Sequence, residues 1–420
     1  MKSLPDLTLP TAADVEAAAQ NLADVVEHTP LLPNARLSAA SGAQVYLKRE
    51  DLQPVRSYKL RGAYNLISSL APAQREAGVI CASAGNHGQG VAFACSALGI
   101  KGRIFVPTTT PRQKRDRMIA LGGEWVELVV TGATYDDAAA AALAAAEQSH
   151  ATLVPAFDHR DIIAGQGSVA PEIVQQLGCA PDVVVVPVGG GGLLAGCLTW
   201  FAEHASQTRI VGVEPASAAC LAAALAAGTP VTLQNIDTFV DGAAVRRAGS
   251  LTHAVAAAHD VELVSVPEGQ VCSEMLDLYQ VDGVLAEPAG ALAPAALRRI
   301  EVEPGQRVVV IISGGNNDVS RYSEIVERSL VFEGRKHYFL VQFSQEPGAL
   351  RRFLDEALGP EDDITLFEYT KRSNRELGPA LVGIELGNPN DLPALLGRIE
   401  LSGIQVERIS PDSPLYRFLV

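Results

Sequence analysis

Residues 182–193 read DVVVVPVGGGGL. An unbroken run of valines suits a strand that is buried on both faces, because helices must then cover both sides of its sheet. Residues 209–214 (RIVGVE) and 307–312 (RVVVII) resemble it. Such strands, alternating with helices, predict an α/β fold with open, mostly parallel sheets joined by right-handed crossovers.

Four consecutive glycines, Gly189–Gly192, follow this strand and precede an apolar helix. A strand, a glycine loop and a helix in this order can hold a phosphate on free backbone N–H groups at the positive helix end. The loop lacks the Gly-Lys-Ser/Thr of a nucleoside-triphosphate loop and the acidic residue of a dinucleotide fingerprint. A flexible structural turn is the alternative, although four glycines lose much backbone entropy and so suggest a reason for their presence.

A second segment, SYKLRGA at residues 57–63, carries a lysine among small and apolar residues. Most lysines are solvated, but burial lowers the pKa of a lysine and makes its amine nucleophilic toward carbonyls. Lys59 is therefore a candidate for a Schiff base. A cofactor with both an aldehyde and a phosphate needs this lysine and the glycine loop together, and pyridoxal 5'-phosphate is such a cofactor.

Two further turns follow predicted strands. Residues 83–88 (SAGNHG) come after strand 79–82, where N–H groups of the next helix could bind a carboxylate and Asn86 could reach a ring oxygen. Residues 313–317 (SGGNN) come after strand 307–312. The hydroxyl of Ser313 could bond to a pyridine nitrogen and leave the ring unprotonated, which suits β-elimination. An ordinary strand-to-helix turn is the alternative for both segments, and His87 alone is more often structural.

The composition narrows the class of protein. Of the 420 residues, 48% are hydrophobic and 19% are charged, enough to bury large cores in two or three domains. A net charge of −15 argues against nucleic acid or an anionic membrane as a partner. Six cysteines without a CxxC pair suggest reduced thiols, and no signal segment or long apolar run is evident. We therefore expect a cytoplasmic protein.

The pattern of strands and helices indicates how the chain is organised. We expect a catalytic domain over residues 1–325, with a small subdomain at about 55–155 inserted in a larger one, then a charged connector over 326–335 and a module over 336–420. Strands at 336–343, 364–372, 380–386 and 405–409 and helices at 349–358 and 392–402 would give the β-α-β-β-α-β order of a ferredoxin-like module. Earlier in the chain we expect helices at 11–27, 58–70, 89–98, 112–121 and 136–149, and strands at 44–48, 102–106 and 124–130.

Five segments in one order resemble those of fold-type II pyridoxal-phosphate enzymes, and specifically of the threonine dehydratases (threonine ammonia-lyases). They are SYKLRGA at 57–63, SAGNHGQG at 83–90, GGGGL at 189–193, EPAGA at 287–291 and SGGN at 313–316. The resemblance covers about residues 20–325, and five motifs in order are far more specific than any one alone. The segment FSQEPGAL at 343–350 resembles the single ACT-like regulatory domain of biosynthetic threonine dehydratases.

The resemblance implies a role for each matching residue. Lys59 would hold the cofactor as a Schiff base and then take the α-proton of the substrate. The other implied cofactor contacts are Tyr58 on the ring face, Asn86 at the 3'-oxygen, Gly189, Gly190, Gly191, Gly192 and Leu193 at the phosphate, Gly242 along the cofactor, Glu287 near the ring, and Ser313 at the pyridine nitrogen. The substrate carboxylate would lie on Ser83, Ala84, Gly85, Asn86 and His87. The family usually has phenylalanine at position 58, so the hydroxyl of Tyr58 needs a partner.

The implied reaction removes the α-proton and the β-hydroxyl of L-threonine as water. The aminoacrylate that is released hydrolyses to 2-oxobutanoate and ammonia, the first step of isoleucine biosynthesis. L-Serine would give pyruvate in the same way. Related serine racemases carry a second serine where this chain has Ala84, so we expect little racemisation. Relatives that bind a divalent cation use a glutamate and an aspartate six residues apart, whereas here Glu214 is followed by Cys220. We expect no tight divalent-metal site, and potassium or another weakly bound cation stays open.

The module after residue 330 implies regulation by an amino acid. Isoleucine is the expected feedback inhibitor and valine the candidate activator, and a coupling of about 1–3 kcal/mol between the two sites would suffice. A structural oligomerisation domain is the alternative, and the family expectation is a homodimer or homotetramer. Two other functions stay open. One is a serine dehydratase or racemase of the same fold, and the other is an inactive amino-acid sensor, against which Lys59 and Ser313 argue.

Overall fold

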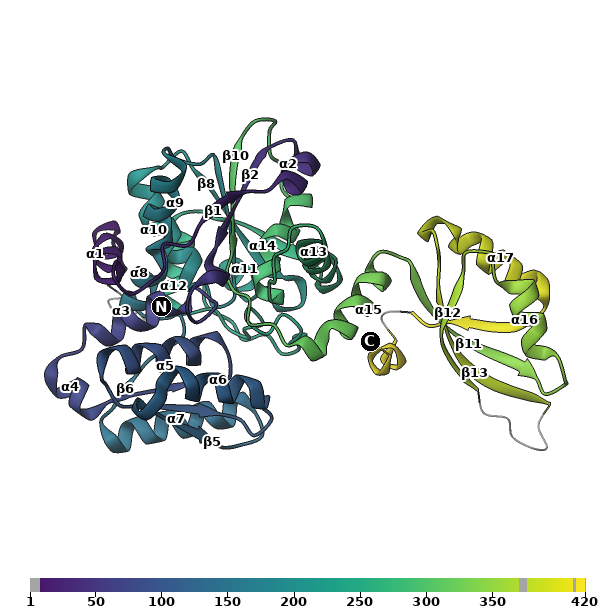
Figure 1. The fold of residues 1–420 in the computed structure, drawn as a ribbon, viewed down its shortest axis with the longest axis horizontal. Coiled ribbons are helices and arrows are strands. Elements are labelled where there is room, and N and C mark those ends of the chain that lie inside the picture. Colours follow the sequence, from purple (N-terminus) through teal and green to yellow (C-terminus); the bar gives the residue numbers. More distant parts are fainter. Residues whose placement is uncertain (1–7, 370–375, 411–412, 420) are drawn as a thin grey trace. The chain divides into compact units, whose positions relative to one another are not determined.

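The computed structural model describes residues 8–369, 376–410 and 413–419. These residues form two compact units. The first unit lies within Met1–Glu268 and Asp277–Asp318, and the second lies within Gly269–Leu276 and Val319–Val420. Figure 1 shows the elements of both units, coloured along the sequence.

The larger sheet of the first unit contains the valine-rich strands. Its strands are Leu31–Pro33 (β1), Gln44–Arg49 (β2), Val183–Pro187 (β7), Arg209–Pro215 (β8), Glu262–Val266 (β9) and Arg307–Ile312 (β10). They lie in the order β1-β2-β10-β7-β8-β9, and all neighbours are parallel except β1 and β2. All five residues of β7 are buried, and Val309 of β10 pairs with Val184 of β7. Burial of the central strands on both faces confirms the predicted mostly parallel α/β sheet.

Helices cover both faces of this sheet (Figure 1). The bounds of the helices around it are Ala12–Leu22 (α1), Ala35–Ser41 (α2), Arg160–Gly167 (α8), Val169–Leu177 (α9), Gly192–His204 (α10), Cys220–Ala227 (α11), Ser250–Ala258 (α12) and Pro288–Ala295 (α14). Apolar residues of α1, α9, α10 and α12 join Val184, Val186 and Val309 in one core on one face. The helix α14 packs on β7, β8 and β10, and its residues are not part of that core. The sheet is therefore the middle of three layers.

A smaller sheet follows the same plan. Its strands, all parallel and in the order β5-β4-β3-β6, are Val79–Ala82 (β3), Gly102–Val106 (β4), Val126–Val130 (β5) and Thr152–Leu153 (β6). Its helices are Lys59–Ser68 (α3), Pro72–Ala77 (α4), Asn86–Leu98 (α5), Arg112–Gly122 (α6) and Tyr135–Ser149 (α7). Side chains of β3 alternate between the two faces, so Cys81 packs with α5 whereas Ile80 packs with α7.

Two predicted helices have different ends from those expected. The Thr11 side chain caps α1 as predicted, and it accepts a hydrogen bond from the N–H of Asp14 at 3.2 Å. The helix ends at Leu22 rather than Glu27, and beyond it the side chain of Gln53 bonds to both backbone groups of Glu27 at 3.0 and 2.9 Å. Conversely, α5 begins at Asn86, three residues before the predicted start, so the motif itself forms the first turn.

The second unit contains an antiparallel sheet covered by two helices. Its elements are Tyr322–Phe332 (α15), Lys336–Ser344 (β11), Ala349–Ala357 (α16), Asp363–Tyr369 (β12), Leu377–Glu385 (β13), Leu392–Ser402 (α17) and Gln405–Arg408 (β14). Its strand order is β12-β13-β11-β14. Phe339 and Val382 from the sheet pack against Phe353 and Leu395 from the helices. The predicted β-α-β-β-α-β order is confirmed, and residues 370–372 of the second predicted strand lie outside the described residues.

Two predictions from the composition concern membrane-spanning helices and the state of the cysteines. In the part of the chain that the structure describes, no helix combines the length and the apolar character needed to cross a membrane. None of the six cysteines forms a disulfide bond among the residues that the structure describes. Five of them are buried and serve as small apolar groups in the cores.

Candidate active site

The predicted site segments lie at the carboxyl ends of parallel strands. Lys59 follows β2 through a short helix at Glu50–Leu52, Asn86 follows β3, the glycine loop follows β7 and Ser313 follows β10. The carboxyl ends of parallel strands meet at one edge of an open sheet, where α/β proteins bind their ligands. This edge of the larger sheet carries Lys59, the glycine loop and Ser313, whereas Asn86 extends from the smaller sheet. Sequence positions more than 200 residues apart are thereby brought into one place.

Lys59 is the first residue of α3. Its Nζ donates a hydrogen bond to the carbonyl oxygen of Ala156 at 3.1 Å and lies 5.2 Å from the centre of the Tyr58 ring. Burial lowers the pKa of Lys59 to about 8, and the nearby Glu287 carboxylate opposes this shift. The amine is therefore partly uncharged near neutral pH, which is the state a nucleophile or a base requires.

The carbonyl of Ala156 connects the lysine with the glycine loop. The amide nitrogen of Gln166 also donates to the Ala156 carbonyl oxygen, at 3.1 Å. The other end of this amide, Gln166 Oε1, lies 2.3 Å from the position that a Cβ of Gly192 would take. Gln166 Oε1 is buried and has no hydrogen-bond partner among the residues that the structure describes. Lys59 is therefore connected to Gly192 through Ala156 and Gln166.

The glycine loop presents unpaired donors at a helix start. Gly191 has a φ of +92°, and a Cβ on Gly190 would lie 2.4 Å from the ring of Phe157, so side chains are excluded at both positions. Among the residues that the structure describes, none accepts a hydrogen bond from the backbone N–H groups of 189–193. The 13-residue helix α10 starts at Gly192. Free N–H groups at the positive end of a helix form a site for a phosphate or another anion.

Asn86, Glu287 and Asn316 meet although they come from three separate loops. The Asn86 amide nitrogen donates to Glu287 Oε1 at 2.5 Å, and its oxygen accepts from Asn316 Nδ2 at 2.7 Å. Asn316 Nδ2 also donates to the carbonyl oxygen of Val55 at 2.8 Å. Burial raises the pKa of Glu287 to about 7, the Asp241 carboxylate adds to this rise, and the hydrogen bond from Asn86 opposes it.

The remaining predicted cofactor residues border this group. Ser313 is buried, and its hydroxyl donates to the carbonyl oxygen of Ala289 at 3.2 Å. A Cβ on Gly242 would lie 2.8 Å from Cβ of Ala289 and 3.5 Å from Oε1 of Glu287. The structure therefore brings Gly242, Glu287, Ser313 and Asn86 together. Tyr58 is half-buried against the core of the larger sheet, and burial raises its pKa.

The segment from Ser83 to His87 forms the start of α5. The Ser83 hydroxyl accepts a hydrogen bond from the N–H of Gly85 at 3.3 Å, and open space surrounds the position of a Gly85 Cβ. Ala84 is half-buried. His87 donates from Nε2 to the Val154 carbonyl oxygen at 2.9 Å, while burial and the charge of Lys59 lower its pKa to about 4. A neutral His87 therefore fixes the helix start and leaves the N–H groups beside it for an anion.

Glu214 does not face a metal-binding partner. Its two carboxylate oxygens accept hydrogen bonds from the N–H groups of Leu221 and Ala222 at 2.7 and 2.9 Å, at the start of α11. Cys220 is buried, and its thiol donates to the carbonyl oxygen of Gly189 at 3.4 Å. Within the described residues, no group of three or more histidine, cysteine, aspartate or glutamate side chains is arranged to hold a metal ion.

A buried ionic network surrounds Arg61, two residues after Lys59, and the sequence motifs did not indicate it. Arg61 is completely buried and donates to Glu50 at 2.8 Å and to Glu172 at 2.6 Å, and Lys48 donates to Glu172 at 2.8 Å. Burial raises the pKa of Glu50. The charge and hydrogen bonds of Arg61, together with Lys48 and Thr29, outweigh burial and lower this pKa to about 2. Neither the network nor the link between Asn316 and Asn86 leaves a signal in sequence spacing, because their members lie 11 to 230 residues apart.

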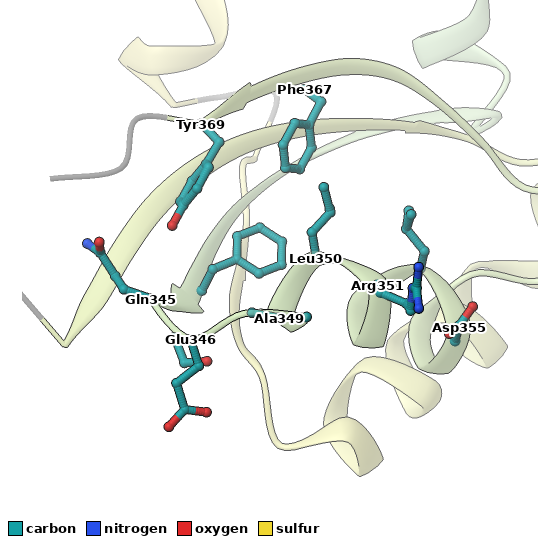
Figure 2. A pocket seen from close by; sticks show the side chains of 12 residues that line it. Gln345, Glu346, Ala349, Leu350, Arg351, Asp355, Phe367 and Tyr369 are labelled. Atoms are coloured by element: carbon teal, nitrogen blue, oxygen red, sulfur yellow. The ribbon is translucent and has the colours of Figure 1, made fainter.

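The second unit holds a pocket of about 740 Å³ between β12 and α16 (Figure 2). Aromatic and leucine side chains line its apolar part, and polar groups surround its entrance. The lining residues are Phe343, Ser344, Gln345, Glu346, Gly348, Ala349, Leu350, Arg351, Leu354, Asp355, Phe367 and Tyr369. Figure 2 shows Leu350 pointing from α16 toward Phe367 on β12. Leu350 and Leu354 are 41% and 40% exposed, so part of this apolar surface is open to solvent.

Comparison with known proteins identifies both parts of the chain. Residues 22–314 match the family described as pyridoxal-phosphate dependent enzyme, and residues 327–419 match the C-terminal regulatory domain of threonine dehydratase. The biosynthetic L-threonine dehydratase IlvA of Mycobacterium tuberculosis is 61% identical over 98% of this chain and 96% of its own length. The corresponding enzyme of Bacillus subtilis is 48% identical over 96% of both chains.

A solved structure supports the same relation. The processed form of threonine deaminase isoform 2 from Solanum lycopersicum superposes with a TM-score of 0.72 at 37% identity, over 78% of this chain and 99% of that chain. The chain therefore belongs to the pyridoxal-phosphate dependent enzymes, which use that cofactor. Within this class it is a member of the biosynthetic L-threonine dehydratase family. The fold class, the cofactor and the family predicted from the sequence are confirmed.

Proposed function

We propose that this protein converts L-threonine to 2-oxobutanoate and ammonia with pyridoxal phosphate as its cofactor, at the start of isoleucine biosynthesis. One observation carries the proposal. The amine of Lys59, whose pKa burial lowers to about 8, donates to the Ala156 carbonyl. The same carbonyl accepts from Gln166, and Gln166 lies against a glycine loop that has free N–H donors. An amine for an aldehyde and a cradle for a phosphate are the two requirements of this cofactor.

The residues of the site fit the cofactor from both ends. We expect the N–H groups of Gly189–Leu193 to hold the phosphate and Lys59 to hold the aldehyde carbon. Asn86 would donate to the ring oxygen, Ser313 would face the ring nitrogen, and Gly242 would leave room for the ring. When bound, the cofactor supplies an electron sink for charge that develops on the substrate α-carbon.

The side chains and backbone around the substrate would carry out the rest of the reaction. The amine of Lys59 takes the α-proton, which its lowered pKa allows near neutral pH. The N–H groups at the start of α5 hold the substrate carboxylate beside Ser83 and Gly85, and the neutral His87 keeps this helix start in place. Ala84 has no hydroxyl to return a proton to the α-carbon, so elimination of the β-hydroxyl proceeds with little racemisation.

Turnover of threonine and serine by the purified protein tests this proposal. We expect threonine to be the better substrate and 2-oxobutanoate to be its product. Lys59→Ala should remove both turnover and the long-wavelength absorbance of the bound cofactor, whereas Lys101→Ala, an exposed lysine, should change neither. Much faster turnover of serine would favour a serine dehydratase, and cofactor binding without any turnover would favour an amino-acid sensor.

We also propose that isoleucine binds to the pocket in the second unit and inhibits the enzyme, with valine opposing it as an activator. The rings of Phe343, Phe367 and Tyr369 lie within 6.4 Å of one another and offer an apolar surface for a branched side chain. Arg351 and Asp355 on α16 could meet the carboxylate and the ammonium group of an amino acid. Isoleucine titration of threonine turnover tests the proposal, and unchanged turnover at saturating isoleucine would contradict it.

We propose further that the protein is a cytoplasmic homodimer or homotetramer. Cysteines without disulfide bonds in the described part of the chain suit a reducing compartment, and the protein's net charge of −15 gives it no attraction to nucleic acid or anionic lipid. Sedimentation of the purified protein would give the number of subunits, and a monomer under the assay conditions would contradict this proposal.

A further inference from the structure

We propose that Asn316 is a positioning residue that fixes the direction of the Asn86 amide, so that one N–H of Asn86 always faces the cofactor ring. The inference rests on the proposed function, in which Asn86 donates to the ring oxygen of pyridoxal phosphate. It adds a residue to which neither the sequence motifs nor that function gave a role of its own.

Three loops meet to hold Asn86. Asn86 opens α5, Glu287 caps α14, and Asn316 follows β10 by four residues. The side chain of Asn316 bonds to Asn86 Oδ1 at 2.7 Å, and the backbone N–H of Asn316 donates to the Glu287 carboxylate. Glu287 in turn accepts from Asn86 Nδ2 at 2.5 Å. The three residues therefore form a closed triangle of hydrogen bonds.

A backbone carbonyl sets the polarity of this triangle. The carbonyl oxygen of Val55 can only accept, so the Asn316 atom that lies 2.8 Å from it must be the amide nitrogen. The same nitrogen contacts Asn86, so the Asn86 atom opposite it must be the amide oxygen. Nδ2 of Asn86 therefore faces Glu287 Oε1, which can accept whether or not the other carboxyl oxygen holds a proton.

One donor of Asn86 is left over by this arrangement. Its amide nitrogen carries two hydrogens, and Glu287 takes only one of them. Among the described residues, none accepts the second hydrogen. The nitrogen lies 4.0 Å from the position that a Cβ of Gly242 would take, and Gly242 is one of the residues that we assign to the cofactor site. We assign this second donor to the cofactor.

Replacing Asn316 would release or reverse this donor. In Asn316→Ala the amide of Asn86 loses its fixed end and can turn over. In Asn316→Asp an ionised carboxylate can only accept, so the Asn86 amide must turn by half a rotation to offer it Nδ2. Oδ1 of Asn86 would then face Glu287 and the cofactor, and an acceptor would stand where a donor is needed.

A double-mutant cycle on cofactor binding tests the inference. The cofactor dissociation constant and the absorbance spectrum would be measured for the wild-type protein, Asn86→Ala, Asn316→Ala and the double variant. We expect Asn316→Ala to weaken binding about 10- to 100-fold, because it leaves Asn86 without its buried partner. We also expect the long-wavelength absorbance to fall. In the Asn86→Ala background the same change should have an effect of less than about twofold, because Asn316 acts through Asn86.

Asn317→Ala is the matched control, because Asn317 is the same residue one position later and its buried amide atoms bond to no described residue. It should leave the dissociation constant and the spectrum unchanged. Equal effects of Asn316→Ala and Asn317→Ala, or full additivity in the cycle, would overturn the inference. If Asn316→Ala does not fold, Asn316→Asp keeps the volume of the side chain, and a spectrum like that of the wild type would overturn the inference equally.

These measurements separate the inference from the proposed function. They need the cofactor and no substrate, so a protein that binds the cofactor but does not turn over threonine would defeat the proposed function and leave the inference standing. Failure of the wild-type protein to bind the cofactor would defeat both. Normal turnover of threonine with an additive cycle would defeat the inference alone.

Discussion

The site around Lys59 and the pocket around Leu350 are built in opposite ways. In the first unit, charged and polar side chains are buried and bonded to one another, as Arg61 is to Glu50 and Glu172. In the second unit, the pocket is lined by aromatic rings and half-exposed leucines, and no charged lining residue is buried. A chemical site needs groups held in fixed positions, whereas a site for a regulatory ligand must be able to fill and empty.

From this contrast we expect mutations in the two units to have different effects on stability and on ligand binding. A buried polar network loses most of its stabilisation when one member is removed, because the remaining charges stay buried without a partner. An open apolar pocket loses only the contacts of the side chain that changes. Substitutions in the first unit should therefore affect folding and chemistry together, and substitutions in the pocket should affect ligand binding alone.

The largest effect should come from Arg61→Met. This change keeps much of the side-chain volume but leaves Glu50 and Glu172 without their arginine, and it should lower the free energy of unfolding by about 3–5 kcal/mol. Denaturant unfolding of the protein would measure this loss. The double variant with Glu50→Gln should recover part of it, and equal stability of Arg61→Met and the wild type would contradict the role of the network.

The pH dependence of this loss has a predictable sign. In the wild-type protein the pKa of Glu50 is about 2, below its ordinary value, so its contribution to stability is complete above about pH 4.5 and is lost as the pH falls toward 2. In Arg61→Met, burial of an unpartnered Glu50 raises its pKa instead. The difference between the two proteins should therefore shrink as the pH falls below about 5.

The next effect concerns the pocket. Leu350→Asp places a carboxylate on the apolar wall opposite Phe367, and we expect about 10- to 100-fold more isoleucine to be needed for inhibition. Threonine turnover without isoleucine should be unchanged. Leu401→Asp is the matched control, since Leu401 is 89% exposed and lies outside the pocket, on α17 of the same unit. Lost sensitivity in the control would show that the unit responds to any added charge.

Much of the fold follows from local sequence. The valine runs predicted the central strands, but they did not predict whether Lys59 and the glycine loop face one another. Neither the end of α1 nor the partners of Arg61 could be predicted in this way. Gln53 holds Glu27, beyond the end of α1, across 26 residues, and Arg61 reaches Glu172 across 111 residues. Such contacts depend on packing between elements, which local periodicity does not contain.

The site and the domain bounds also depend on contacts between elements that local sequence does not contain. Residue types in motifs indicated which groups a cofactor would need, but the direction of the Asn86 amide depends on Val55 and Asn316, which only the fold brings near. The two compact units and the two family matches, at 22–314 and 327–419, divide the chain at similar places. The bounds predicted from composition at 325 and 335, and the subdomain at about 55–155, stay predictions.

A smaller effect should appear in the loading of the cofactor onto Lys59. Only the uncharged amine attacks an aldehyde, so the rate should rise about tenfold between pH 6 and 7 and level off above the pKa of about 8. An ordinary lysine would continue to rise beyond pH 10. Glu287, whose pKa is about 7, loses its proton in this range and holds back part of the rise by favouring charged Lys59. Stopped-flow absorbance of the apoprotein mixed with pyridoxal phosphate would measure the profile.

The smallest effect should come from Lys114→Met, which tests a polar contact at the exposed edge of the same site. Lys114 on α6 pairs with Asp241 at 2.7 Å, and their side chains are 19% and 39% exposed. Solvent and salt screen such a pair, so its removal should cost less than about 1 kcal/mol of stability. Asp241 precedes Gly242, so we expect the KM for threonine to rise about two- to fivefold and kcat to stay constant. Added salt should raise the KM of the wild-type protein toward that of the variant and leave the variant unchanged. A fall in kcat as large as that in Lys59→Ala would contradict this prediction. It would mean that this exposed pair acts together with the buried polar groups around Lys59.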